Sequence, residues 1–246
     1  MTDRAAAAPD PALTALARTA ADEVADGMIV GLGTGSTAEA LVRELGRRVA
    51  DGLRVVGVPT SERTGRLARS VGIPVRTLND VLEADDRISV GIDGADEIDP
   101  MLNATKGRGG ALLFEKLVAL SCQRFVLIAG EAKLVSRLGS RMPLPVEVVA
   151  LGWPGTLGRL RDLGLNPRLR LAAAGESGSP APYRTDSQNL IIDCATGALA
   201  DPGSIAASLK MTTGVVDHGL FLGIAHAAYV ADADGGVRLL SPAVAR

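Results

Sequence analysis

The chain has 246 residues, 47% of them hydrophobic, and 26 Lys and Arg residues nearly balance 28 Asp and Glu residues, giving a formal net charge of −2. This composition excludes a disordered, collagenous or coiled-coil protein. One Trp, two Tyr and three Phe, with no basic excess, provide neither the charge nor the stacking groups of a nucleic-acid-binding protein, so no nucleic-acid partner is expected.

Cysteine usage and hydropathy indicate the compartment. Cys122 and Cys194 form no CxxC pair, so we expect two buried thiols and no disulfide framework. No apolar run approaches the roughly 18 residues of a membrane span, and the first residues do not form a secretory signal segment. We therefore expect a cytoplasmic protein without a membrane partner.

Helical and strand-like patterns alternate through the first part of the chain. Helices are predicted over 13–25, 36–49, 61–71 and 111–120, and strands over 28–32, 54–58, 73–77, 87–92 and 125–129. Ser36 and Glu39 have the spacing of a capping box at the start of the second helix. The alternation predicts an α/β fold with a doubly wound, mostly parallel sheet.

The pattern changes near residue 140. Prolines, the β-rich runs 146–149 and 189–194, and a Gly/Pro/Ser-rich stretch over 175–182 predict a small α+β domain over 139–215. The apolar run 221–230 indicates a return, so residues 1–138, completed by 216–246, are predicted to form the larger domain.

The run Gly31-Leu32-Gly33-Thr34-Gly35-Ser36-Thr37 stands where a strand meets a helix. Backbone N–H groups at a helix N-terminus, with nearby hydroxyls, bind phosphate, so this loop predicts a phosphate site. A plain tight turn is the alternative. The sequence lacks both the acidic residue that a dinucleotide fingerprint needs after the next strand and the Gly-Lys-Ser/Thr of a P-loop.

The run Asp93-Gly94-Ala95-Asp96-Glu97-Ile98-Asp99 places four carboxylates in seven residues directly after a predicted strand. Functional groups of open α/β sheets gather beyond the carboxyl ends of strands, and like charges held close raise each other's pKa. A role in proton transfer is the sharper interpretation. A Mg²⁺ site and a solvated acidic turn remain alternatives, and the spacing does not demand a metal.

The run 106–116 has the sequence KGRGGALLFEK. A cation before a glycine turn is placed to meet developing negative charge, and a carboxylate early in a helix is stabilised by the helix dipole. Lys106 and Glu115 are therefore expected to share one cleft. Lys116 is expected to be a surface charge, and His218 a turn or packing residue.

The motifs GTGST, DGADEID, KGRGGALLFEK and GVVDHGLF, in this order, resemble the ribose-5-phosphate isomerase family of type A, from about residue 12 to about residue 233. The resemblance implies a Rossmann-like α/β domain interrupted by a smaller α+β domain. It also implies interconversion of D-ribose 5-phosphate and D-ribulose 5-phosphate in the pentose phosphate pathway, without metal or organic cofactor, by a homodimer or homotetramer.

Site residues follow from the matched motifs. Glu115 matches the general base of the family, and Arg108 stands where the commonest glycine loop has Gly. The stretch 185–189 lacks an Asn-Gly turn that many members have. The substrate-binding positions implied by the resemblance are Thr34, Gly35, Ser36, Thr37, Asp93, Gly94, Ala95, Asp96, Lys106, Gly107, Arg108, Gly109 and Lys133.

An aldose–ketose conversion needs a base and charge stabilisation at the oxygens. We expect Glu115 to move the proton from C2 to C1 through a cis-enediolate that Lys106 stabilises, with Asp93 and Asp96 serving ring opening and proton shuttling. Alternatives are an amino-sugar-phosphate deaminase, a phosphogluconolactonase or a sugar-phosphate sensor. The two enzymes leave KGRGGALLFEK without a role, and a sensor needs a DNA-binding segment.

Overall fold

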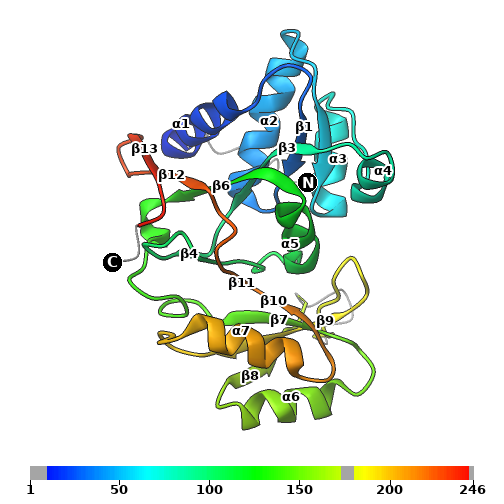
Figure 1. Ribbon diagram of the computed structural model, residues 1–246, viewed down its shortest axis with the longest axis vertical. Helices are drawn as coiled ribbons and strands as arrows, with labels where there is room; N and C mark the ends of the chain where they lie inside the picture. The colour runs from blue at the N-terminus through cyan, green and yellow to red at the C-terminus, as the bar shows by residue number, and fades with distance from the viewer. Residues whose placement is uncertain (1–9, 173–179, 244–246) are drawn as a thin grey trace, which may run out of the picture.

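The computed structural model describes residues 10–172 and 180–243. Within these ranges the strands form three sheets, of six, four and three strands (Figure 1). The first nine residues, where no signal segment is expected, and residues 175–179 of the Gly/Pro/Ser-rich stretch lie outside the described residues.

The six-stranded sheet is mostly parallel, as predicted. Its order is β13-β12-β6-β3-β1-β2, and only β13 runs antiparallel to its neighbour. Because the central strands are covered on both faces, they read as continuous apolar runs. The strands are β1 (Ile29–Leu32), β2 (Val56–Pro59), β3 (Ile88–Gly94), β6 (Cys122–Gly130), β12 (Ala227–Ala231) and β13 (Val237–Leu240).

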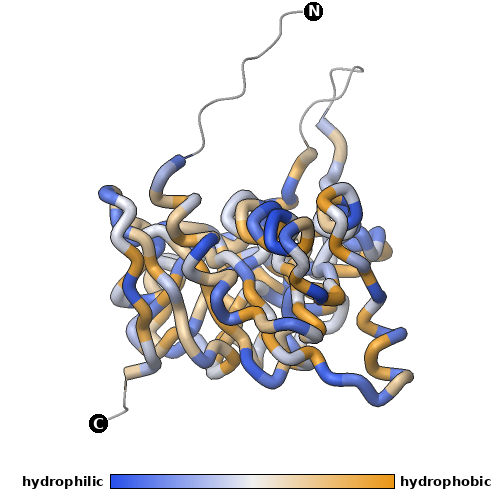
Figure 2. The backbone as a smooth tube through the Cα atoms, turned by 90° about the horizontal axis from the view of Figure 1, so that it is seen from above, coloured by the Kyte–Doolittle hydropathy of each residue, from blue (hydrophilic) through white to orange (hydrophobic). Residues whose placement is uncertain are grey.

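Helices cover the two faces of this sheet and bury their apolar stripes against it. One core cluster contains side chains of α1, α2 and α3, and another contains side chains of α4 and α5. Hydrophilic and hydrophobic residues alternate along the peripheral helices in Figure 2, as amphipathic packing requires. The helices are α1 (Pro11–Ala20), α2 (Ser36–Ala50), α3 (Glu62–Ser70), α4 (Leu78–Glu83) and α5 (Leu112–Leu120), with the short 3₁₀ helix η1 (Ala21–Glu23).

Two local predictions are wrong. The run 73–77 is not a strand, because only a single bridge joins Val75 to Gly57, and α4 follows instead. The capping box is absent from α2, because Gly35, at φ 111°, is the N-cap and Ser36 already belongs to the helix. This positive φ is a backbone conformation that favours glycine. The Glu39 carboxylate pairs with Arg63 rather than with the helix start.

The four-stranded sheet is antiparallel, in the order β10-β7-β9-β8. Helices α6 and α7 pack on it around buried apolar side chains such as Leu160 and Leu209. Strand β10 pairs with β7, so residues 216–218 lie in this sheet, while the division at 139–215 stays a prediction. The elements are β7 (Leu144–Val148), α6 (Trp153–Asp162), β8 (Asn166–Leu169), β9 (Leu190–Ala195), α7 (Pro202–Met211) and β10 (Val215–His218).

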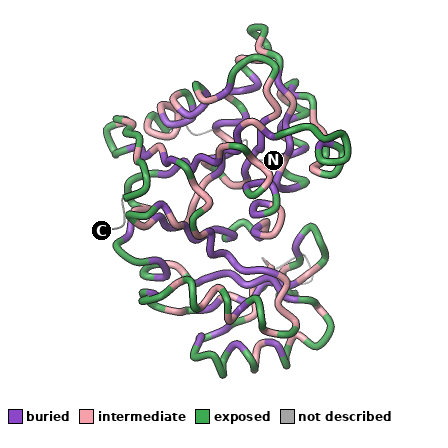
Figure 3. The backbone as a smooth tube through the Cα atoms, in the orientation of Figure 1, coloured by how far each residue is buried: buried purple, intermediate pink, exposed green. Residues whose placement is uncertain are grey.

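A three-stranded sheet, β11-β5-β4, lies between the larger sheets (Figure 1). Helix α5 contacts β3 and β6 of one large sheet and β7 and β10 of the other. Figure 3 shows buried strands and exposed outer helical turns. The remaining elements are β4 (Glu97–Ile98), β5 (Ala104–Thr105), β11 (Leu220–Phe221) and the 3₁₀ helix η2 (Glu131–Lys133).

The thiols and the hydropathy pattern agree largely with expectation. Both cysteines are free; Cys194 is buried, while Cys122 is only partly so. Burial raises the pKa of each thiol to about 12. Across 10–172 and 180–243, no helix combines the length and apolar character that crossing a bilayer requires.

Candidate active site

The predicted site residues gather at one edge of the six-stranded sheet. Strands β1, β3 and β6 are parallel neighbours, so the loops at their carboxyl ends meet there. A cavity of about 330 Å³ opens at this edge. Of the predicted site residues, only Asp93 is absent from its lining, and it lies directly beneath. The lining residues are Thr34, Gly35, Ser36, Thr37, Gly94, Ala95, Asp96, Lys106, Gly107, Arg108, Gly109, Glu115 and Lys133.

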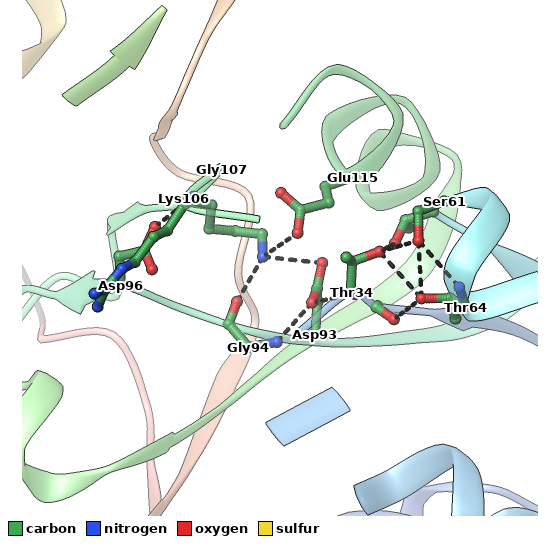
Figure 4. A network of polar contacts seen from close by, with 12 residues as sticks. Thr34, Ser61, Thr64, Asp93, Gly94, Asp96, Lys106, Gly107 and Glu115 are labelled. Carbon is green, nitrogen blue, oxygen red and sulfur yellow. Dashed lines mark hydrogen bonds and ion pairs between the residues drawn. The ribbon is translucent and has the colours of Figure 1, made fainter. Parts of the chain in front are cut away.

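Three buried ionisable side chains form the floor of the cavity (Figure 4). Lys106 Nζ lies 2.9 Å from Asp93 Oδ2 and 3.3 Å from Glu115 Oε1. It also donates a hydrogen bond of 2.6 Å to the carbonyl oxygen of Gly94. The three side chains are between 2% and 4% exposed. One ammonium is thus held between two carboxylates, with little water to screen them.

Burial dominates the electrostatics of this group. It raises the pKa of Glu115 to about 8, against the lowering effect of the Lys106 ammonium. Burial also raises the pKa of Asp93, again opposed by Lys106. Burial disfavours the charged form of Lys106, but the two carboxylates outweigh it and raise its pKa. The surroundings of Glu115 therefore favour its protonated form more than water does for an exposed glutamate.

Glu115 presents one oxygen that no protein group occupies. Its Oε1 contacts Lys106, whereas Oε2 is buried and has no hydrogen-bond partner among the residues described. A buried carboxylate oxygen without a partner is costly unless another molecule supplies one. Glu115 lines the cavity, while this oxygen itself is buried within the protein.

The phosphate loop predicted between β1 and α2 is fastened to Asp93. The Oδ1 atom of Asp93 accepts hydrogen bonds from the backbone N–H of Thr34, at 3.0 Å, and of Gly94, at 2.7 Å. A Cβ atom at Gly33 would lie 2.1 Å from this oxygen, so only glycine allows the approach. Ser36 and Thr37, at the start of α2, line the cavity, and the first N–H groups of a helix have no partner within it.

A cluster of hydroxyl groups behind this loop was not anticipated from the sequence. Thr34 Oγ1 lies 2.7 Å from Thr60 Oγ1, 2.9 Å from Ser61 Oγ and 3.2 Å from Thr64 Oγ1. Figure 4 shows the Thr34 side chain pointing toward Ser61 and Thr64, away from Lys106. The available signal was that Thr60 and Ser61 directly follow β2, the neighbour of β1 at the same sheet edge.

The acidic side chains of the run 93–99 differ in their surroundings: some lie at the cavity, and others accept hydrogen bonds from backbone N–H groups. Asp96 lines the cavity and accepts a hydrogen bond from the backbone N–H of Arg108. Glu97 is fully buried and accepts backbone N–H groups of residues 139, 141 and 142. Asp99 accepts those of Met101 and Asn103, so it holds a turn. Among the described residues no group of three or more His, Cys, Asp and Glu side chains is arranged to hold a metal ion.

The expectation that Lys116 is a surface charge is wrong. It is 9% exposed, and its Nζ donates to Asp217 Oδ1 at 2.6 Å and to the carbonyl oxygen of His218 at 2.5 Å. The reason is that α5 is covered on both sides, so a residue beside Glu115 still faces protein. His218 packs as expected: it is buried, burial lowers its pKa to about 4, and its Nδ1 accepts the N–H of Leu220.

Fold and site together define an α/β protein in which the start of a helix and a buried carboxylate line one cavity at the carboxyl ends of parallel strands. The sequence profile of the family described as ribose 5-phosphate isomerase A (phosphoriboisomerase A) matches residues 56–235. The chain belongs to the ribose 5-phosphate isomerase A family.

Relatives in sequence and structure agree with this assignment. The ribose-5-phosphate isomerase A of Thermomicrobium roseum is 52% identical over 225 residues, 91% of each chain, and that of Roseiflexus castenholzii is 51% identical over 94% of this chain and 95% of its own. The solved ribose 5-phosphate isomerase from Plasmodium falciparum superposes with a TM-score of 0.86 at 37% identity, over 95% of this chain and 99% of that one.

Proposed function

We propose that the chain interconverts D-ribose 5-phosphate and D-ribulose 5-phosphate. The observation that carries this proposal is the Glu115 carboxylate, which lies in the lining of the cavity, is buried beside Lys106 and has one oxygen without a hydrogen-bond partner among the described residues. The family assignment names the substrate pair. No observation favours the deaminase, lactonase or sensor alternatives, and the relatives named above are all isomerases.

The reaction moves protons only. Glu115 removes the proton from C2 of the open-chain aldose, the C2–H electron pair forms the C1–C2 double bond, and the carbonyl oxygen at C1 takes the negative charge. The protonated Glu115 then delivers the proton to C1, while the hydroxyl proton of O2 passes to O1. The sum is an isomerisation through a cis-enediolate, with nothing gained or lost.

Charge stabilisation falls to Lys106, whose ammonium lies 3.3 Å from the base. A cation already held in a water-poor site meets the enediolate oxygen without reorganisation. From the sequence, both Asp93 and Asp96 are expected to serve ring opening and proton shuttling. Because Asp93 lies beneath the cavity and contacts Lys106, we assign these steps to Asp96, and to Asp93 the holding of Lys106.

The phosphate group is assigned to the start of α2. Residues 35–37 line the same cavity as Glu115, and the dipole at the start of a helix favours an anion. Lys133, at the end of η2, and Arg108 add positive charge to the same cavity. A solved relative with a TM-score of 0.87 at 35% identity is described in complex with phospho-erythronic acid, itself a phosphorylated sugar derivative. Anchoring a remote phosphate holds the reacting carbons against the base.

Further parts of the proposal concern the whole protein. We propose that the enzyme works without metal or organic cofactor, since Glu115 supplies a base and Lys106 a cation for the proton transfers. Residues 139–215 are proposed as a small α+β domain within the larger one, supported by the separate core around the four-stranded sheet. Family membership supports a homodimer or homotetramer in the cytoplasm, with a sugar phosphate as its ligand.

The test is a coupled assay of ribulose 5-phosphate formation by EDTA-treated protein, with Glu115→Gln beside the wild type. The wild type should be active, and Glu115→Gln should lose at least about 10²-fold in kcat while retaining most substrate binding. Glu83→Gln, at an exposed glutamate far from the cavity, is the matched control and should leave kcat unchanged. An active Glu115→Gln enzyme would remove the assigned base, and activity restored only by Mg²⁺ or Mn²⁺ would contradict metal independence.

A further inference from the structure

The glycine loop 106–110 is held from outside the six-stranded sheet. Arg170 follows β8, and its Nη1 donates to the carbonyl oxygens of Gly107, at 3.1 Å, and Arg108, at 2.9 Å. The Tyr183 hydroxyl donates to the next carbonyl, that of Gly109, at 3.1 Å. Three successive carbonyl groups of the loop are therefore satisfied by two side chains more than 60 residues further along the chain.

Arg170 is itself fixed in place. Its Nε and Nη2 donate to the two carboxylate oxygens of Asp193, at 2.8 and 2.5 Å, and the two side chains are 15% and 24% exposed. This forked pairing uses one edge of the guanidinium and leaves Nη1 directed at the loop. The Tyr183 ring lies 5.9 Å from the Arg170 guanidinium, and the Tyr183 N–H donates to the Arg170 carbonyl oxygen.

The loop approaches these groups closely. A Cβ atom at Gly110 would lie 2.2 Å from the Tyr183 hydroxyl oxygen, and Gly110 has a φ of +81°. Within the loop only short-range bonds are made, such as Gly110 N–H to the Gly107 carbonyl oxygen. A segment without regular structure keeps its path through contacts with other parts of the chain, which here are the contacts with Arg170 and Tyr183.

We propose that Arg170, held by Asp193 and assisted by Tyr183, is a positioning residue that sets the glycine loop 106–110, and with it Lys106, for the reaction. This inference rests on the proposed isomerase function and extends it to residues of the other sheet. Arg170 does not line the cavity of Glu115, so it acts through the loop rather than on the sugar.

A merely structural role and a positioning role predict different pH behaviour. The Lys106 ammonium lowers the pKa of Glu115 against the effect of burial. If the loop loses its restraint, Lys106 spends less time beside Glu115, and the pKa of the base rises. The acid limb of kcat/KM then moves to higher pH. A variant that only unfolds more easily lowers the amount of active enzyme and leaves this limb in place.

The experiment compares Arg170→Met, Tyr183→Phe and Arg168→Met with the wild type. Arg168 is an exposed arginine on β8 whose guanidinium makes no hydrogen bond to a described residue, so it is the matched control. Native-state hydrogen exchange is followed by mass spectrometry in peptides covering 106–111 and in the rest of the chain. The pH profile of kcat/KM for ribose 5-phosphate is measured with the same samples.

Arg170→Met is expected to accelerate exchange in 106–111 by at least about tenfold, without a change in the central strands. It should also lower kcat by at least about tenfold and move the acid limb upward, since small displacements of a catalytic group are costly. Arg168→Met should match the wild type. Unchanged loop exchange and an unchanged pH profile in folded Arg170→Met would overturn the inference.

Two further outcomes remain decisive. If Arg170→Met does not fold, Tyr183→Phe serves instead, because it removes one hydroxyl and keeps the ring. Faster hydrogen exchange at 109–111 in this variant would support the inference. Hydrogen exchange at the wild-type rate would contradict it. A wild-type chain without isomerase activity would contradict the proposed function, while loop exchange would still report separately whether Arg170 holds the loop.

Discussion

At the scale of single residues, the proposed chemistry rests on an ammonium that is shared by two carboxylates. Asp93 and Glu115 are both buried and both contact Lys106. Asp93 also accepts two backbone N–H groups, which leaves Glu115 as the carboxylate with a free oxygen and the one facing the cavity. Two acids of the same group thus acquire different roles from their surroundings.

The raised pKa of Glu115 predicts the pH dependence of catalysis. A base must be deprotonated, so kcat/KM should rise with pH through about 8, instead of reaching its plateau just above the usual pKa of glutamate, 4.5. Lys106 has a raised pKa and stays charged, so it should add no alkaline limb in the same range. Initial rates measured between about pH 5 and about pH 10 test this prediction, provided that the protein stays folded over this range. A plateau already reached at pH 6 would contradict the assignment.

At the scale of elements, the hydroxyl cluster joins the loops that follow two neighbouring strands. Thr64 Oγ1, at the start of α3, donates to the Gly33 carbonyl oxygen at 3.0 Å and also contacts the hydroxyls of Thr34 and Ser61. Through these bonds, α3 holds the loop that precedes α2. The start of α2, where the phosphate is assigned, is therefore supported by a helix with no direct part in the chemistry.

Thr64→Val is predicted to weaken phosphate binding. Replacing a hydroxyl that is 1% exposed leaves a buried carbonyl and two hydroxyls short of a partner, at a cost of about 1–3 kcal/mol in the free energy of unfolding. Because the loop loosens, KM for ribose 5-phosphate should rise more than kcat falls. Thr19→Val removes a hydroxyl that bonds only within α1 and is the control. A Thr64→Val enzyme with wild-type KM and stability would show that the cluster does not support the loop.

At the scale of the whole molecule, α5 connects the two large sheets. One of its side chains, Glu115, faces the cavity, while its neighbour Lys116 pairs with Asp217 of β10. The Lys106 and Lys116 ammonium groups lie 5.5 and 5.1 Å from the ring centre of Phe221, so the same aromatic ring separates the two charged groups. The helix that carries the base is thus tied to the four-stranded sheet as well as to the parallel one.

Lys116→Met is predicted to reduce stability without altering the chemistry. Removing one partner of a buried ion pair typically costs about 3–5 kcal/mol, and we expect about 2 kcal/mol because Asp217 keeps its contact with Lys210. The free energy of unfolding in urea measures this loss. The acid limb of kcat/KM should stay where the wild type has it. A moved limb would instead place Lys116 among the groups that set the pKa of Glu115.

The alternation of strands and helices and the mostly parallel sheet follow from patterns in the sequence, whereas the residues that line the cavity were named from the motifs together with the family resemblance that these carry. Local patterns were sufficient because parallel strands bring the loops at their carboxyl ends together, whatever the details of packing. The predictions that were wrong also concern local structure. The run 73–77 is apolar enough for a strand, but pairing needs a neighbour along its whole length. The N-cap of α2 is Gly35 and not Ser36, so the predicted capping box does not form.

Only the tertiary structure decided which charged groups are buried and what meets the glycine loop. The sequence around Lys116 is typical of a surface charge, but α5 lies between two sheets and Lys116 is buried. The four clustered carboxylates are equivalent in the sequence, but Glu97 accepts hydrogen bonds from backbone N–H groups. Nothing near Gly107 in the sequence points to Arg170. Burial and long-range hydrogen bonds depend on elements far apart in the chain, so the pKa of Glu115 and the support of its neighbours arise only from the folded arrangement.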